Sequence, residues 1–148
     1  MISCKSSNEK SIQLLDKYDF NTGKYKLYGI ICEAKPTNFS NKVESFVVED
    51  TITLNKIKHD WQICYTDKRM PCGITYMMVL MKDDSCVYNF GINLECDYLI
   101  CNLGWFEFPE KLMNKYENLV KRIPNEVAFA LHDTLIKKHT FDEKKIKK

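Results

Sequence analysis

The chain has 148 residues, of which 45% are hydrophobic and 28% are charged, and its formal net charge is +2 at pH 7. These values lie near the averages of globular proteins, so they exclude a largely disordered chain and a strongly basic domain. The length favours a single domain over residues 1–148, with flexible ends at 1–6 and 141–148.

The seven cysteines are scattered, and three of them, Cys32, Cys86 and Cys101, sit inside apolar runs. A free thiol behaves as a small buried hydrophobe, and the first residues lack the apolar core of a signal peptide. We therefore expect reduced cysteines and a cytoplasmic protein. No apolar run approaches the ~18 residues that cross a bilayer, which predicts no membrane association.

The first half of the chain predicts one helix followed by strands. Residues 7–18 are expected to form a short amphipathic helix capped by Ser7 or Asn8. Alternation and many β-branched or aromatic residues predict a strand over 24–34, and one long or two short strands over 43–54. Period-two alternation of Trp61, Ile63 and Tyr65 predicts a further strand over 60–66.

A hairpin is the clearest pattern in the middle of the chain. The stretch 74–81 is apolar on both faces, as in a central strand, and 82–85 forms the turn into a strand over 86–94. One face of the second strand is predicted to be apolar, with Cys86, Tyr88, Phe90, Ile92 and Leu94. Residues 98–108 predict one further strand.

Two helices are predicted to close the chain. The first begins at Pro109 and continues through Ile123, and the second contains Val127, Ala128, Leu131 and Leu135 and extends to Lys138. Strands followed by helices predict an α+β fold: an antiparallel sheet of about six strands, curved or sandwich-like, followed by two C-terminal helices.

Metal and cofactor sites are not predicted. The metal-ligating residues are spaced too widely for a structural zinc site, which favours close pairs of cysteines. This set consists of His59, Cys64, Cys72, Cys96 and Cys101. The chain also lacks a glycine-rich phosphate-binding motif, so no nucleotide cofactor is expected.

Catalysis lacks a clear candidate residue. His132 and His139 lie two turns apart on the predicted last helix, ~10 Å at the helix rise, which is too far to share one ion comfortably. His132-Asp133-Thr134 matches one H-x-T element of a two-histidine phosphoesterase, but the required second element is missing. A hydrolase that uses His59, His132 or a cysteine remains an alternative hypothesis.

The aromatic segment 104–108 is the candidate protein-binding site. Trp105, Phe106 and Phe108 cannot all point to one face of a strand, so either part of the segment is exposed or a second face is covered. Exposed aromatic side chains are enriched at protein interfaces. The sequence therefore predicts a protein partner at these three residues.

A lysine-rich tail over 137–148 gives the alternative partner, nucleic acid. The tail carries a local charge of +4, and neutralisation of phosphates would make such binding steeply dependent on salt. The candidate nucleic-acid-binding residues are Lys137, Lys138, Lys144, Lys145, Lys147 and Lys148.

These patterns favour a non-enzymatic protein-binding module, such as an inhibitor or immunity-type factor. The small size and the Lys-, Ile- and Asn-rich composition are similar to those of accessory proteins of viruses and mobile elements, although no motif points to a named family. A homodimer through a strand edge is a further hypothesis.

Overall fold

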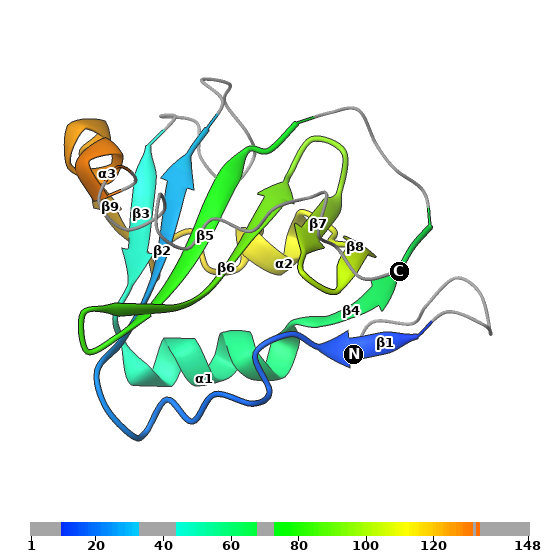
Figure 1. Ribbon diagram of the computed structural model, residues 1–148, viewed down its shortest axis with the longest axis horizontal. Helices are drawn as coiled ribbons and strands as arrows, with labels where there is room; N and C mark the ends of the chain where they lie inside the picture. The colour runs from blue at the N-terminus through cyan, green and yellow to red at the C-terminus, as the bar shows by residue number, and fades with distance from the viewer. Residues whose placement is uncertain (1–9, 33–43, 68–72, 132, 134–148) are drawn as a thin grey trace.

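One antiparallel sheet organises the structure, a computed structural model that describes residues 10–32, 44–67, 73–131 and 133. Within these residues the sheet has nine strands in the order β1-β4-β8-β7-β6-β5-β2-β3-β9. Figure 1 shows it as a curved, open sheet with α1 below the strands and α3 beside β3 and β9. The strands are β1 (Ser11–Gln13), β2 (Tyr25–Ile31), β3 (Ser45–Val48), β4 (Gln62–Tyr65), β5 (Tyr76–Lys82), β6 (Ser85–Asn93), β7 (Tyr98–Cys101), β8 (Gly104–Glu107) and β9 (Lys121–Ile123). The helices are α1 (Thr51–Asp60), α2 (Lys111–Asn114) and α3 (Asn125–Leu131).

The predicted α+β class and mainly antiparallel sheet are confirmed, but the number of strands and the placement of the helices differ from the prediction. The strands predicted over 24–34 and 60–66 form as β2 and β4. The helix predicted over 7–18 is wrong where the structure describes it, because residues 11–13 form β1 beside β4. The apolar stripe of residues 7–18 is short, so the local preference for a helix is weak and pairing with β4 outweighs it.

Helix α1 replaces the second half of the strand expected over 43–54. Asp50 caps it, because its carboxylate accepts hydrogen bonds from the Thr53 amide at 2.8 Å and from the Thr53 hydroxyl at 2.7 Å. A side-chain acceptor at this position satisfies an amide that the first turn leaves unpaired. Leu54 and Ile57 point into the core, so the segment is helical despite its β-branched residues.

The predicted β5–β6 hairpin is confirmed, with one change of face. Asp83 and Asp84 form the turn with φ of 48° and 71°, the left-handed backbone that a two-residue hairpin requires. The register shifts between Leu80 and Met81, and Cys86 packs with the second face while Tyr88 packs with the main core. A bulge of this kind reverses the alternation, which a strict period-two pattern cannot anticipate.

The single strand predicted over 98–108 is instead the β7–β8 hairpin. Ile100 pairs with Trp105 and Cys101 pairs with Gly104, whose φ of 127° allows the tight return.

The first of the two predicted C-terminal helices is largely wrong. Only Lys111–Asn114 is α-helical, and 121–123 pairs with β3 as strand β9. Leu112 and Tyr116 do enter the core, as the helical spacing predicted. The end of the predicted helix, however, pairs with β3, and a local sequence pattern gives no sign of this distant partner. The second helix is confirmed as α3, and its predicted extension to Lys138 lies outside the described residues.

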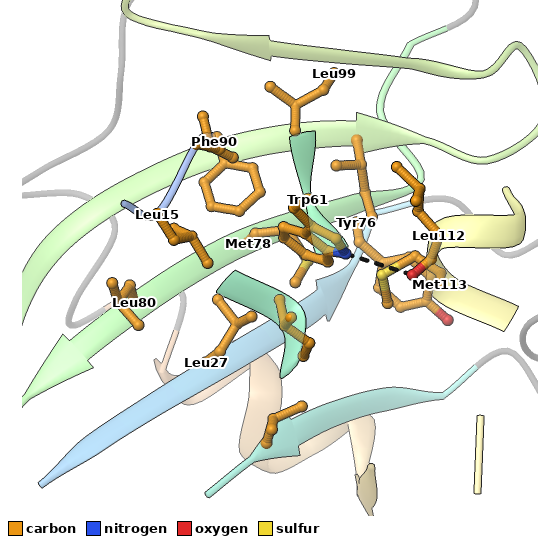
Figure 2. Close-up of a cluster of buried hydrophobic side chains, with 14 of the residues drawn as sticks. Leu15, Leu27, Trp61, Tyr76, Met78, Leu80, Phe90, Leu99, Leu112 and Met113 are labelled. Atoms are coloured by element: carbon orange, nitrogen blue, oxygen red, sulfur yellow. Dashed lines mark hydrogen bonds between the residues drawn. The ribbon is translucent and has the colours of Figure 1, made fainter. Parts of the chain in front are cut away.

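The main core lies on one face of the sheet, under α1 and α2. Trp61 is fully buried there and makes edge-to-face contacts with Phe108 and Phe90, at ring-centroid distances of 5.1 and 6.0 Å. Its Nε1 donates a hydrogen bond to the Leu112 carbonyl at 3.4 Å, drawn as the dashed line in Figure 2. Trp61 therefore joins the end of α1, the sheet and the start of α2.

The second face of the sheet carries two smaller clusters. In one, Ala128 of α3 packs with Ile30 and with the β5 residues Met77, Val79 and Met81. The other contains Tyr98, Ile100 and Trp105. Apolar side chains thus cover both faces of the central strands, which explains why β5 has no polar side.

In the part of the chain described, none of the helices combines the length and the apolar character needed to cross a membrane.

Candidate functional site: an apolar edge beside β9

The aromatic residues predicted to bind a partner lie in the interior. Trp105, Phe106 and Phe108 are only 7%, 3% and 0% exposed. Phe106 and Phe108 belong to the main core, whereas Trp105 stacks on Tyr98 on the second face at 4.9 Å. Of the two alternatives that the sequence left open, the structure has the covered second face, because side chains pack on both faces of β8. Their predicted role in binding is not tested.

The other predicted sites lie mostly outside the described residues. This applies to Cys72, His132, His139 and the lysine-rich tail over 137–148. Within the described residues, no group of three or more His, Cys, Asp or Glu side chains could hold a metal ion.

The cysteines differ from the sequence expectation. Cys32, Cys86 and Cys101 are not in disulfides, but Cys64 and Cys96 are each disulfide-bonded, so the expectation of reduced cysteines is wrong for these two. Burial raises the pKa of Cys86 and of Cys101, which keeps both thiols protonated at neutral pH. A protonated buried thiol is a poor nucleophile, which weighs against cysteine-based hydrolysis at either residue.

His59 takes part in a polar cluster at the end of α1. Its Nδ1 lies 3.4 Å from the Asp60 carboxylate, which also receives the Tyr116 hydroxyl and, at 2.7 Å, the Lys115 ammonium. Partial burial raises the pKa of Asp60, but the hydrogen bonds from Lys115, Tyr116 and His59 outweigh it and lower this pKa to about 2. The carboxylate is thus held ionised by donors from two elements, an arrangement suited to joining α1 to the segment after α2.

Exposed apolar residues concentrate at the other end of the molecule. Seven large apolar side chains are exposed among the described residues, and three of these lie between residues 119 and 129. They are Leu119, Val127 and Phe129, at 49%, 51% and 50% exposure, and we call them the apolar edge. They flank β9, which ends the strand order of the sheet. An outer strand with exposed apolar neighbours is a surface at which proteins associate.

Helix α3 begins with the polar residues Asn125 and Glu126 and continues with five apolar residues, Val-Ala-Phe-Ala-Leu over 127–131. Ala128 is fully buried against the sheet, and Leu131 packs against the same cluster. Val127 and Phe129 stand on either flank of this buried side at 100° per residue, and each is half exposed. An apolar stretch longer than one helical turn is normally enclosed, and here the protein encloses one side of it.

The first turn of α3 is anchored to the sheet by polar contacts. The Asn125 side-chain oxygen accepts hydrogen bonds from the Ser45 amide at 3.2 Å and from the Ser45 hydroxyl at 3.4 Å. That hydroxyl also accepts a hydrogen bond from the Ile31 amide at 3.0 Å. The half-exposed side chains are therefore presented from a fixed position, which lowers the entropy cost of binding.

Sequence reasoning placed Val127 on the helix but did not identify the apolar edge. The signal was present, since five consecutive apolar residues in a helix cannot all face one sheet.

Comparisons with known proteins identify no relative: no protein-family model, curated protein or solved structure matches this chain.

Proposed function

We propose that the protein is a non-catalytic binding protein whose partner is another protein that receives α3 in an apolar groove. The observation that carries this proposal is the half exposure of Val127 and Phe129 on a helix whose last five residues are all apolar. Insertion of a short apolar helix into a groove is a recurrent mode of protein recognition. An inhibitor or immunity-type factor of a virus or mobile element is the narrower form of the proposal.

The charges around the apolar edge suit a polar rim. Lys121 of β9 lies 3.9 Å from Glu49, which is also 3.9 Å from Lys26. These side chains are 43% to 75% exposed, so the pairs add little stability on their own. At the margin of a docked partner they would favour the correct orientation more than the affinity.

The proposal is tested by affinity capture from native cells with matched variants. Val127→Gln with Phe129→Gln removes the apolar surface while retaining good helix formers. Ile52→Gln on α1 is the control, because Ile52 is 67% exposed and lies on a different element. We expect one stoichiometric protein partner with the wild type and the control, and at least a tenfold loss with the double variant.

Three other results would contradict the proposal. Equal capture by the double variant would show that the partner binds elsewhere. Dimerisation of the wild type that disappears in the double variant, measured by light scattering, would assign the apolar edge to self-association. Recovery of nucleic acid that is lost on deletion of 137–148 and on addition of salt would favour the tail hypothesis.

A further inference from the structure

The outer strand β1 carries an inference about self-association. In the described sheet β1 stands first in the strand order and pairs with β4, as Figure 1 shows at the N-terminal end of the sheet. Ser11 and Gln13 are exposed, and Ile12 between them is half-buried. An outer strand directs one row of backbone amides and carbonyls away from its sheet, and such a row can pair with a further strand.

The hydrogen bonds between β1 and β4 show which backbone groups point outward. The Tyr65 amide donates to the Lys10 carbonyl at 2.8 Å, and the Leu14 amide donates to the Trp61 carbonyl at 3.3 Å. In an antiparallel pair, residues that exchange such bonds alternate with residues that do not. The even-numbered residues of this segment therefore direct their backbone groups at β4, and the odd-numbered residues direct theirs away from the sheet.

The outward backbone groups belong to Ser11 and Gln13. The Gln13 carbonyl accepts a hydrogen bond from the Asp16 amide at 3.2 Å, but a carbonyl oxygen has two lone pairs and can accept a second bond. Both residues can thus donate and accept a backbone hydrogen bond across the edge.

β1 lacks the features that commonly protect a sheet edge against pairing, which are charged side chains, proline and bulges. Its sequence is the uncharged Ser-Ile-Gln, and its register with β4 is continuous. Strand β9, at the other end of the sheet, differs from it. Antiparallel self-pairing about the middle residue of β9 would place Arg122 opposite its own copy, and like charges directly opposite each other are destabilising. Of the two ends of the described sheet, β1 is therefore the one that suits a second copy.

We propose that β1 pairs antiparallel with β1 of a second copy, about a two-fold axis at Ile12. In this register Ser11 lies opposite Gln13 of the second copy, and the two residues exchange backbone hydrogen bonds on each side of the axis. The two Ile12 residues form a non-hydrogen-bonded pair, in which side chains approach most closely. Lys10 falls opposite Leu14 of the second copy, so like charges do not face each other within this register. The paired strand has three residues, so the interface is small and the dimer is weak and reversible.

Apolar surface beside the axis supports a second copy as the occupant. Ile12 packs against the main core from the edge of the sheet and is only partly buried. Tyr65 of β4 contacts the ring of Phe106 in the same core, and its side chain is 38% exposed. A two-fold dimer would cover part of this surface in both copies at once, as an isologous interface does.

Sedimentation velocity of the purified full chain, from micromolar to millimolar concentration, is the first measurement. We expect a reversible equilibrium between monomer and dimer, and a chain that stays monomeric at millimolar concentration overturns the proposal. The variant Val127→Gln with Phe129→Gln should dimerise as the wild type does, because the apolar edge is a different surface. Loss of the dimer in that variant would assign it to α3 instead of β1.

Two charge variants test the register of the pairing. Ser11→Lys with Gln13→Lys places like charges opposite each other on both sides of the axis, so the dimer should weaken by about 2- to 30-fold. Ser11→Lys with Gln13→Glu places opposite charges in the same pairs and should dimerise at least as tightly as the wild type. The variants differ only at residue 13, so each is the control for the other. Equal dimerisation of the two variants, or weaker dimerisation of the variant with glutamate, would contradict the antiparallel register.

Gln13→Pro tests the backbone pairing without a change of charge. Proline removes the outward amide of residue 13, and the bonds between β1 and β4 do not use this amide, so the monomer should keep its circular dichroism spectrum. The dimer should be lost. An undiminished dimer in this variant would overturn the proposal. So would wild-type oligomers larger than a dimer, which head-to-tail pairing of β1 with β9 would produce.

Discussion

At the residue scale, Asp60 is the clearest case of an ionisable group shaped by its surroundings. Its pKa is about 2 in the folded protein, below the ordinary value of 3.8, because donors from Lys115, Tyr116 and His59 outweigh the opposing effect of burial. Because the pKa of Asp60 is lower in the folded state than in the unfolded state, the ionised carboxylate stabilises the protein at pH values above the pKa of the unfolded state. That contribution is lost as the pH falls through about 2.

We predict that Asp60→Asn lowers the free energy of unfolding by about 1 kcal/mol at pH 7, a value reduced from the full shift because the pair is solvent-screened. The difference from wild type should shrink below about pH 4 and vanish near pH 2. Urea denaturation across this range checks the prediction, with the exposed turn residue Asp16→Asn as control. A constant difference at all pH values would show that the charge is not responsible.

Gly29 is required because a neighbouring ring occupies the space of a side chain. A Cβ at this position would lie 2.3 Å from ring carbons of Phe46, the residue opposite it in β3. We predict that Gly29→Ala lowers the free energy of unfolding by about 1–3 kcal/mol, as overpacking does. In a double-mutant cycle, Phe46→Leu should recover part of this loss. Strict additivity in chemical denaturation would contradict the clash.

At the element scale, α1 depends on its cap more than on its sequence preference. Asp50→Ala should shift the melting temperature down by a few degrees, because the Thr53 amide and hydroxyl lose their acceptor. Asp50→Asn should retain most of the stability, since its side-chain oxygen can still accept. Hydrogen bonds from the Thr53 side chain and amide lower the pKa of Asp50, so the cap should weaken in acid. Thermal melts followed by circular dichroism measure both variants, and equal losses would exclude capping as the cause.

The elements differ in how well local patterns predicted them. β5 is a continuous apolar run, β6 alternates, and the acidic residues that join them tolerate a left-handed turn, so their hairpin was predicted. The segment 109–123 has helical spacing but divides into α2 and β9, because β3 offers a pairing edge to Lys121–Ile123. Pairing with a distant strand contributes free energy that cannot be read from a short stretch of sequence.

At the scale of the whole molecule, Trp61 holds together the elements around the main core. It is fully buried and contacts Phe90, Phe108 and the carbonyl of Leu112. We predict that Trp61→Ala costs about 3–5 kcal/mol, a large part of the roughly 5–15 kcal/mol that stabilises a typical domain. Trp61→Phe should cost less because it keeps an aromatic ring.

Denaturant unfolding followed by circular dichroism measures both variants, and the fluorescence of Trp105 provides a second probe at the other face of the sheet. The two probes should report the same transition if the faces unfold together. A cost of less than about 1 kcal/mol for Trp61→Ala would show that the core around it relaxes to fill the space.

For the candidate sites, as for the helices and strands, the sequence predicted local features but not the burial that the folded structure determines. Consecutive aromatics at 105 and 106 correctly indicated two occupied faces of a strand, but their burial depended on which segments cover each face. Exposure is a property of the assembled molecule, so the apolar edge became visible only when α3 was placed at the end of the sheet.

The sequence by itself determined the α+β class, the strands β2, β3, β4, β5 and β6, and helix α3, because alternation, turn residues and helical spacing act between near neighbours. The tertiary structure decided the remaining strands, the positions of α1 and α2, the burial of Trp105 and the disulfide-bonded state of Cys64 and Cys96. Each of these depends on contacts between residues far apart in the chain, whose free energy no local pattern records.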